Sequence, residues 1–378
     1  MSQSPSTFDR INNWARRSVM LKLFTIGILI LFLLIPTSML DGLIYQRQNL
    51  RDSAQVEVAS KWGLQQTIGG PIISVPYTYK TAISTDEDGK VSYSTNSGYA
   101  HFLPEELEIE GELLPEERYR GIFVVVLYNT KLNVKGKFGP FDAAALGVPE
   151  TALRWEDASL NLGITDMTGV QSAIEVNIEA DSSLSLGPGT VTGDVFSSGA
   201  STSLPLSGVD NTLNFSFELD LNGSSAFYFR PFAKRTAVSL VGTWPSPSFD
   251  GAFLPKKRSV ENGNFTANWE VLQLNRNYPQ QGTGSFTPKI SDYRNSSIYV
   301  DEYSQNYDQE DRFGLRLLLP VDEYKKTYRS TNFAVLFIFI TFLTFFFIEV
   351  LNRRRVHPVQ YLLIGAAIII FYILLLSI

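Results

Sequence analysis

The amino-acid sequence predicts an α+β membrane protein, with three transmembrane helices and a large, mainly β domain between the first and the second. Three long runs without charged residues, at 23–40, 330–348 and 359–378, predict the helices. Alternation of apolar and polar residues in the intervening segment predicts antiparallel sheets with one solvated face. Basic residues beside the apolar runs predict the orientation in the membrane.

The first predicted transmembrane helix covers 23–40 and follows a cytoplasmic N-terminus, 1–22. Roughly 20 helical residues cross a hydrocarbon core of ~30 Å, so the run is about long enough. A cleaved secretory signal is the alternative, but its apolar region is usually about 7–15 residues, and 36–40 matches a small-residue cleavage site poorly. We therefore predict a retained anchor. The basic flank that keeps its start in the cytoplasm consists of Arg16, Arg17 and Lys22.

Residues 330–351 and 358–378 are the predicted second and third transmembrane helices, with a cytoplasmic turn at 352–357 between them. Lys and Arg in such a short connection set the orientation. Glu349 is the one charged residue inside the predicted second helix, and it precedes Arg353, the first arginine of the turn, by four residues. We predict an i,i+4 pair of these two at the membrane interface. The arginines of the turn are Arg353, Arg354 and Arg355.

Residues 41–329 form the predicted exported domain. Its first part, about 41–62, is expected to continue the first helix as a stalk, and strands follow. The clearest alternation runs over 213–221, where five apolar residues are separated by Asn, Ser, Glu and Asp. Asn222-Gly223 comes directly after this strand and predicts a hairpin. The Gly-, Ser- and Thr-rich stretch at about 192–208 predicts a loop or a linker between two β subdomains.

Charge and composition exclude several classes of function. Of the formal charge of −6, residues 1–40 carry +3 and residues 330–378 carry +2, which leaves −11 for the exported segment. Such a segment repels a phosphate backbone, so no nucleic-acid partner is expected. The absence of cysteine excludes disulfides and thiolate metal sites. His101 is the only exported histidine, and no zinc motif or nucleophile elbow surrounds it, so we expect a structural histidine, no catalytic residue and no metal or cofactor.

The segment 244–258 is the most unusual part of the exported domain, since it combines prolines and aromatic residues with a basic cluster in an acidic surrounding. This composition predicts either a buried structural corner, which we favour, or an exposed patch that binds a partner. The residues concerned are Trp244, Pro245, Pro247, Phe249, Phe253, Leu254, Pro255, Lys256, Lys257 and Arg258.

The same segment, 244–255, resembles the CreD family of bacterial inner-membrane proteins, as do 70–76 (GPIISVP), 101–105 (HFLPE) and 341–363, which contains His-Pro-x-Gln-Tyr-Leu-Leu. The resemblance implies a multi-pass inner-membrane protein with one large periplasmic domain after the first helix. It also implies a functional link to a two-component system that responds to envelope stress, and to colicin tolerance. Members usually continue through more membrane helices than this sequence contains, and the family supplies no catalytic residues.

We therefore expect a non-enzymatic protein of the inner membrane that supports cell-envelope integrity and the envelope-stress response. Its expected partners are the lipid bilayer and other envelope proteins or components, which its periplasmic domain would bind. A component of a transporter or channel is the alternative, and it would need polar residues along the membrane helices. An envelope-modifying enzyme is the third hypothesis, and it would need a cleft with converging acids around His101 or Glu105.

Overall fold

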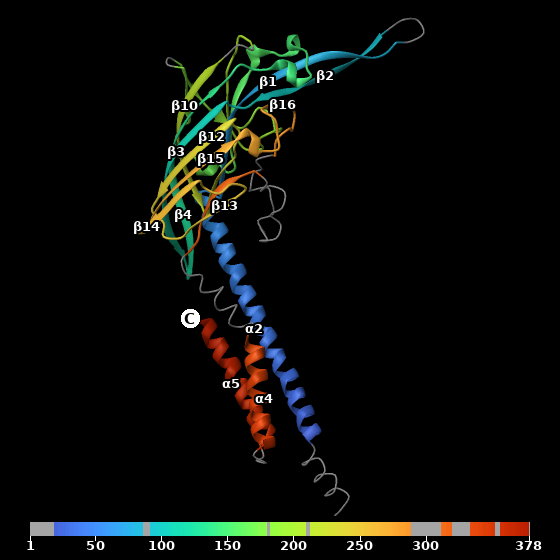
Figure 1. Ribbon diagram of the computed structural model, residues 1–378, viewed down its shortest axis with the longest axis vertical. Helices are drawn as coiled ribbons and strands as arrows, with labels where there is room; N and C mark the ends of the chain where they lie inside the picture. The colour runs from blue at the N-terminus through green and yellow to red at the C-terminus, as the bar shows by residue number, and fades with distance from the viewer. Residues whose placement is uncertain are drawn as a thin grey trace, which may run out of the picture. The chain divides into compact units, whose positions relative to one another are not determined.

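The structure is a computed structural model of the chain and has two compact units. One unit comprises Met1–Ser53 with Val321–Ile378 and holds apolar helices; the other, Ala54–Pro320, holds the β-sheets (Figure 1). The residues that the structure describes are 19–85, 91–179, 182–208, 212–288, 311–319, 333–351 and 356–377.

Helix α2 is a single helix of 44 residues, Val19–Trp62. It contains both the predicted first transmembrane segment and the predicted stalk, and residues 41–62 are helical throughout. Near its end Lys61 Nζ lies 3.2 Å from Glu57 Oε1, an i,i+4 pair. Lys22 lies in this helix, whereas Arg16 and Arg17 are outside the described residues.

The second and third apolar runs form helices α4, Ala334–Leu351, and α5, Pro358–Ser377. Helix α5 begins at Pro358, where the missing N–H leaves no helical hydrogen bond unmade. Among the described helices, α2 alone is long and apolar enough to cross a membrane by length and composition, and the apolar stretches of α4 and α5 are shorter. The predicted topology residues Arg353, Arg354 and Arg355 are outside the described residues.

The three helices share a small apolar cluster. Leu33 of α2, Phe342 of α4 and Tyr361 of α5 are all buried in it. Gly365 permits the close approach, because a Cβ there would lie 2.3 Å from Leu33 Cδ1. Small residues have this function in many helix contacts of membrane proteins.

The β unit contains two sheets. The eight-stranded sheet has the order β14 (Lys257–Glu261), β15 (Asn264–Leu272), β12 (Arg235–Gly242), β3 (Glu106–Arg120), β4 (Phe123–Phe138), β10 (Leu213–Ser224), β6 (Glu175–Ile178) and β7 (Ser182–Ser185). The nine-stranded sheet has the order β13 (Pro247–Gly251), β17 (Phe313–Leu317), β11 (Ala226–Phe229), β1 (Gln66–Thr85), β5 (Ser159–Ile164), β9 (Gly199–Ser203) and β8 (Gly187–Pro188), with β2 (Val91–Phe102) beside β1 and β16 (Gln281–Thr283) beside β2. Short 3₁₀ helices cover Ala143–Leu146, Glu150–Ala152, Trp155–Asp157, Met167–Gly169 and Gln273–Asn275.

The mainly β domain is confirmed, but its sheets are mixed where antiparallel sheets were predicted. Strand β1 pairs in parallel with β11, and β3 pairs in parallel with β12. The prediction was wrong on this point because a period of two records which face of a strand is buried and carries no information about the direction of its neighbour.

The predicted hairpin after the best strand is also wrong. Strand β10 continues through Asn222 and Gly223 to Ser224, and Ser225 then has a positive φ of 62°. The chain next enters β11, which joins the other sheet beside β1 and β17. The turn therefore carries the chain from one sheet to the other, and no hairpin forms.

The stretch at about 192–208, predicted as a loop or a linker between two subdomains, is irregular at 192–198 and belongs to the β unit. It contains β9, which pairs with β5 and β8. Val195 and Phe196 are each 1% exposed. A segment that contributes a strand and buried side chains to one compact unit does not separate two subdomains.

The core lies between the two sheets, because aromatic rings of one sheet pack on rings of the other. Trp269 of β15 lies 5.9 Å from Phe313 of β17, and Tyr128 of β4 lies 5.7 Å from Phe227 of β11, measured between ring centroids. These four side chains are at most 2% exposed. Alternate residues of each strand therefore face this layer, and the residues between them face outward.

Close packing between β11 and β17 generates a testable prediction. A Cβ added at Gly314 would lie 2.1 Å from the carbonyl oxygen of Phe227, a backbone atom that has no rotamer to change. Gly314→Ala should lower the free energy of unfolding by about 1–3 kcal/mol, the range for overpacked sites. The midpoint of urea unfolding of the purified chain measures this. Gly187→Ala is the control, since the nearest atom there is 3.7 Å away, and equal effects of both variants would contradict the prediction.

Candidate functional site: a groove beside an edge strand

The aromatic half of the segment 244–258 is a structural corner. Trp244 is 5% exposed, and its Nε1–H donates to the carbonyl oxygen of Leu318 at 2.9 Å. The ring of Phe249 packs 5.8 Å from that of Trp269, in the layer between the sheets. Phe253 packs against the same layer. Pro245 precedes and Pro247 opens the edge strand β13, a position where a proline removes no inner ladder hydrogen bond.

The basic half of the same segment is exposed. Leu254 is 66% exposed, Pro255 is half-buried, and Lys256, Lys257 and Arg258 all lie on the surface. Lys257 and Arg258 begin β14, the edge strand of the eight-stranded sheet. The segment 244–258 is therefore divided, with buried aromatic residues before Leu254 and exposed basic residues after it.

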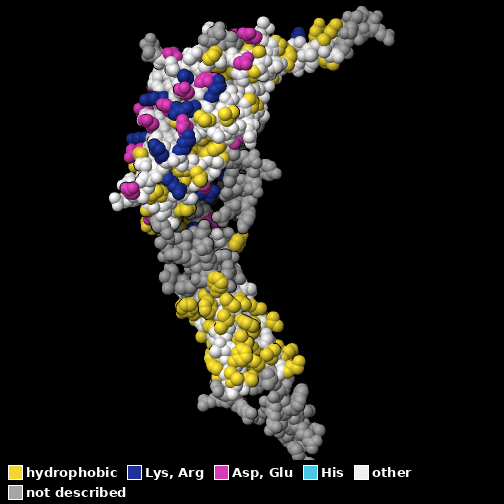
Figure 2. Space-filling model, viewed as in Figure 1, with side chains coloured by type: hydrophobic (Ala, Val, Ile, Leu, Met, Phe, Trp, Pro, Cys, Tyr) yellow, Lys and Arg dark blue, Asp and Glu magenta, His cyan; other side chains and the backbone are white. Residues whose placement is uncertain are grey.

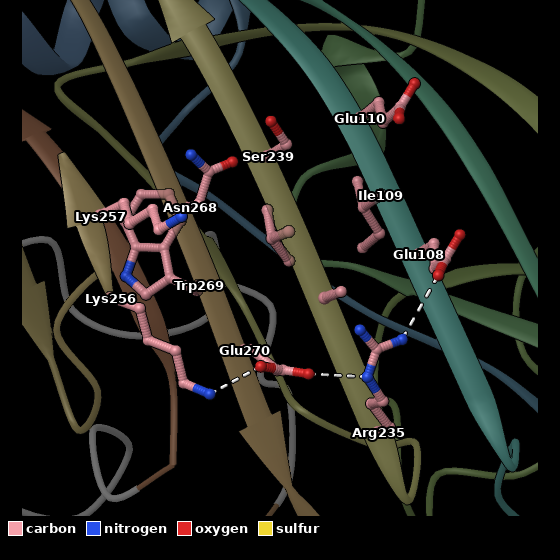
Figure 3. Close-up of a pocket in the computed structure, with 12 residues that line it drawn as sticks. Glu108, Ile109, Glu110, Arg235, Ser239, Lys256, Lys257, Asn268, Trp269 and Glu270 are labelled. Carbon is pink, nitrogen blue, oxygen red and sulfur yellow. Dashed lines mark hydrogen bonds and ion pairs between the residues drawn. The ribbon is translucent and has the colours of Figure 1, made fainter. Parts of the chain in front are cut away.

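A groove of about 510 Å³ lies beside this basic surface, on the outer face of the eight-stranded sheet (Figure 3). We call it the outer groove. Its residues come from β3, β12, β14 and β15 and from the residue before β14: Glu108, Ile109, Glu110, Arg235, Ala237, Val238, Ser239, Lys256, Lys257, Asn268, Trp269 and Glu270.

Small side chains on the middle strand form the floor of the outer groove. Ala237 on β12 lies opposite Glu108 of β3 on one side and Glu270 of β15 on the other. Ser239 is flanked in the same way by Glu110 and Asn268. Two short side chains between two rows of longer ones leave a hollow along the strand, because side chains of one face stand in register across neighbouring strands.

Ion pairs line one end of the outer groove. Arg235 Nε lies 2.7 Å from Glu270 Oε1, Arg235 Nη1 lies 3.4 Å from Glu108 Oε1, and Lys256 Nζ lies 2.6 Å from Glu270 Oε2 (Figure 3). Hydrogen bonds from Lys256 and Arg235 lower the pKa of Glu270. Exposed pairs of this kind contribute about 0.2–1 kcal/mol each, so a charged ligand can exchange with one of them at small cost.

The outer groove thus offers both signs of charge. Among the described residues no salt bridge involves Lys257 or Glu110, which stand on opposite walls. Within the described part of the chain no group of three His, Asp or Glu side chains is placed to hold a metal ion. The arrangement is suited to binding a polar chain or headgroup that carries both charges.

A second polar site lies on the outer face of the nine-stranded sheet and is closed. His101 is fully buried, Ser74 Oγ lies 2.9 Å from its Nδ1, and Asp194 Oδ2 lies 3.3 Å from its Nε2. The imidazole is stacked on Phe286 with 6.0 Å between ring centroids. Ser74 is 1% exposed, so its hydroxyl has no open side for a substrate.

Hydrogen bonding assigns one neutral tautomer to His101. Asn161 Nδ2 donates to Ser74 Oγ at 3.1 Å, which leaves the hydroxyl hydrogen of Ser74 to point at His101 Nδ1. The Nε2–H then donates to the Asp194 carboxylate. Burial lowers the pKa of His101, and Asp194 opposes this shift without reversing it.

The sequence did not identify Glu108, Arg235 and Glu270 as parts of one site. A signal was present, because Glu106, Glu108, Glu110 and Glu112 alternate with other residues and so occupy one face of β3. Their partners on β12 and β15 come from more than a hundred residues further along the chain, and nothing local in the sequence identifies them. Glu105, singled out beside His101, pairs with Lys234 at 2.6 Å.

An apolar helical unit joined to a mainly β unit with a charged face is typical of a membrane protein (Figure 2). The model of a protein family described as "Inner membrane protein CreD" matches residues 18–378, so this chain belongs to the CreD family of inner membrane proteins. It is 29% identical over 352 residues to the Inner membrane protein CreD of Escherichia coli (strain K12). The aligned region covers 92% of this chain and 72% of that protein.

The buried imidazole generates a prediction on pH. A lowered pKa in the folded chain means that the unfolded chain takes up the proton more readily, so the contribution of His101 to stability is present above pH 6.5 and is lost as the pH falls below it. The midpoint of urea unfolding of the purified chain should therefore decrease between pH of about 7.5 and 5.5. His101→Gln should flatten this decrease and His357→Gln should keep it; an unchanged decrease in His101→Gln would count against the assignment.

Proposed function

We propose that this inner membrane protein supports cell-envelope integrity and the envelope-stress response by binding an envelope protein or component in the outer groove. The observation that carries the proposal is the groove itself, which combines an uncharged floor with walls of both charges. The chain belongs to a family of inner membrane proteins, and its charged β unit is the part suited to contact a partner in water. The link to a two-component system is part of this proposal.

We also propose that α2, α4 and α5 each cross the membrane and that the β unit lies in the periplasm. Large apolar side chains on these helices are exposed, among them Phe24 at 67%, Leu351 at 77% and Leu363 at 63% (Figure 2). Apolar area of this kind is stable in lipid and unfavourable in water, at about 25 cal/mol per Å². The basic residues at 16–22 and 353–355 support a cytoplasmic position for both of those segments.

We propose a non-enzymatic role, and the closed site around His101 supports it. The histidine and Ser74 are covered, and Asp194 is the one carboxylate that the described residues place on the imidazole. Glu349 bears on the alternative of a transport role, since a buried acid among apolar helices is a candidate for one. It is 5% exposed and accepts a hydrogen bond from Tyr361 Oη at 3.3 Å, which supports a packing contact between α4 and α5.

A reporter enzyme that is active only after export tests the topology. Fusion after Gly208 should give high activity, because that position follows β9 in the β unit, and fusion after Arg355 should give background activity. Reporter activity measured in intact cells, normalised to the amount of fusion protein, decides between the orientations. Activity at Arg355 with none at Gly208 would refute the proposed topology.

Photo-crosslinking tests the outer groove. A photoreactive amino acid at Ser239, on the groove floor, should form an adduct with an envelope partner in intact cells, whereas one at Ser183, on the distant edge strand β7, should not. Ala237→Arg fills the floor and should reduce the Ser239 adduct about ten-fold, equivalent to about 1.4 kcal/mol of binding. Val241→Arg, on the same strand but outside the groove, should leave the adduct intact. Equal yields from Ala237→Arg and Val241→Arg would contradict the proposal.

A further inference from the structure

Four side chains of the outer groove form a row across its strands. They lie in register on neighbouring strands, and they are Glu110 of β3, Ser239 of β12, Asn268 of β15 and Lys257 of β14 (Figure 3). We call these four residues the polar row. Among the residues that the structure describes, none of these four side chains makes a hydrogen bond or an ion pair. The polar row is therefore available to a ligand in the groove.

The adjacent row of the groove shows how this surface holds a cation. There Ala237 has Glu108 opposite it on β3 and Glu270 opposite it on β15. The guanidinium of Arg235, from the same strand as Ala237, bridges the two carboxylates at 3.4 Å and 2.7 Å. A small residue between two longer ones thus leaves space for a cationic group, and in this row the chain itself supplies that group.

The polar row repeats this arrangement around a second small residue. Glu110 and Asn268 flank Ser239 as the two glutamates flank Ala237, and no Lys or Arg among the described residues bridges them. Both flanking side chains are exposed, so they can turn toward the half-buried Ser239. The position above Ser239 is therefore the counterpart of the position that the Arg235 guanidinium takes in the adjacent row.

The acceptors of the polar row select the kind of cation. The Glu110 carboxylate, the Ser239 hydroxyl and the Asn268 side-chain carbonyl come from three strands that are about 4.8 Å apart. An ammonium group has three N–H donors and no acceptor, so it can donate one hydrogen bond to each of the three oxygens. The single carboxylate balances its single charge. A guanidinium prefers the paired oxygens of carboxylates, which the adjacent row provides.

Lys257 supplies the opposite charge at the end of the polar row. It lies two strands from Ser239, a distance of about 10 Å between the strands. The lysine side chain covers part of this distance, so an anion bound to it lies closer than 10 Å to a cation above Ser239. In an extended peptide, side chains two positions apart share one face and are about 7 Å apart. This separation fits the two charges of the polar row.

The groove offers a ligand no apolar surface. Its apolar residues Ile109, Val238 and Trp269 are at most 3% exposed, because their side chains belong to the layer between the sheets. An acyl chain in the groove would remain exposed to water, at a cost of about 25 cal/mol per Å² of apolar area. A peptide with polar side chains has no such cost. The lining therefore favours a polar peptide over a lipid.

We propose that the outer groove binds an extended peptide segment of an envelope protein, in which a lysine and an acidic residue are two positions apart. The lysine ammonium of the peptide donates to Glu110, Ser239 and Asn268, and the carboxylate of the peptide accepts from Lys257. This inference rests on the proposed function and specifies the ligand of the same groove.

Two peptides of identical composition test the spacing of the charges. Ser-Lys-Ser-Glu-Ser presents both charges on one face, whereas Ser-Lys-Glu-Ser-Ser presents them on opposite faces. Each carries a benzophenone group at its N-terminus and an amide at its C-terminus, and each is irradiated with the purified full chain. The first peptide should reach half-maximal labelling at a concentration about ten-fold lower than the second. Equal concentrations would overturn the proposal.

Substitutions in the polar row test its residues with the first peptide. Glu110→Gln and Lys257→Gln should each raise the concentration for half-maximal labelling about ten-fold. Glu112→Gln is the matched control, because Glu112 is the next outward residue of β3, lies opposite Lys131 and Val241, and is outside the groove. It should leave the labelling unchanged. Equal effects of Glu110→Gln and Glu112→Gln would contradict the assignment of the ammonium group to the polar row.

Glycerophosphoethanolamine tests a lipid headgroup as the ligand, since it carries an ammonium group and a phosphate. It should not compete with the first peptide at equal concentration; competition as strong as that of the unlabelled peptide would overturn the choice of a peptide.

A comparison in cells separates this inference from the proposed function. A photoreactive residue at Ala237, beside the polar row, should capture an envelope partner, and Glu110→Gln should reduce this adduct about ten-fold relative to Glu112→Gln. Equal adducts in both variants would overturn the inference and leave the proposed function standing. No adduct in cells, with the peptide selectivity retained in the purified chain, would contradict the proposed function alone.

Discussion

Burial of one apolar layer between the two sheets is the constraint on which the rest of the β unit depends. Trp269 and Phe265 of the eight-stranded sheet meet Phe313 and Phe249 of the nine-stranded sheet in this layer. Because a strand alternates its side chains, each residue that faces the layer places its neighbours on the outside. The outward position of Arg235, Glu270 and Ser74 on their strands follows from that choice of inner face.

The two outer faces then have different environments. On the eight-stranded sheet the outer residues remain in water, where Arg235, Glu270 and their neighbours form exposed pairs around small residues of β12. On the nine-stranded sheet the residues near β1 are covered, so Ser74 and His101 must satisfy each other and Asp194. The same alternation therefore produces an open groove on one side and a closed polar network on the other, because buried polar groups require partners and solvated ones do not.

A third environment is that of the ends of β1 and β2, which extend beyond the two sheets (Figure 1). The projecting ends of these strands, residues 78–83 and 91–98, have no apolar interior, and their side chains are exposed or half-buried. Their ladder of backbone hydrogen bonds is continuous with the sheet, so their direction is set at the base, where Ile73 and Val75 are fully buried. Buried side chains therefore hold this segment to the unit at its base, whereas its projecting end buries none.

Local patterns predicted the local structure well. The alternation at 213–221 predicted β10, and the run before Trp62 predicted the continuation of α2. The segment 244–258 was recognised as special, and the structure divides it, since Trp244 is buried and Lys257 is exposed. Predictions that needed a partner strand failed, such as the hairpin after Asn222 and the antiparallel sheets, because the neighbour of a strand is chosen by packing over long distances along the chain.

The sequence by itself determined the apolar helices, the β character of the middle segment, its acidic charge and the family, since each is recorded in composition, in a short period or in a motif. Only the tertiary structure decided which strands lie side by side, and with them the outer groove, the projecting ends of β1 and β2, and the closed site. Ser74 and His101 are 27 residues apart in the chain, and His101 and Asp194 are 93 apart. Contacts at such separations form because whole faces of strands are buried. A periodic pattern shows that a face is buried but does not identify the strand that packs against it.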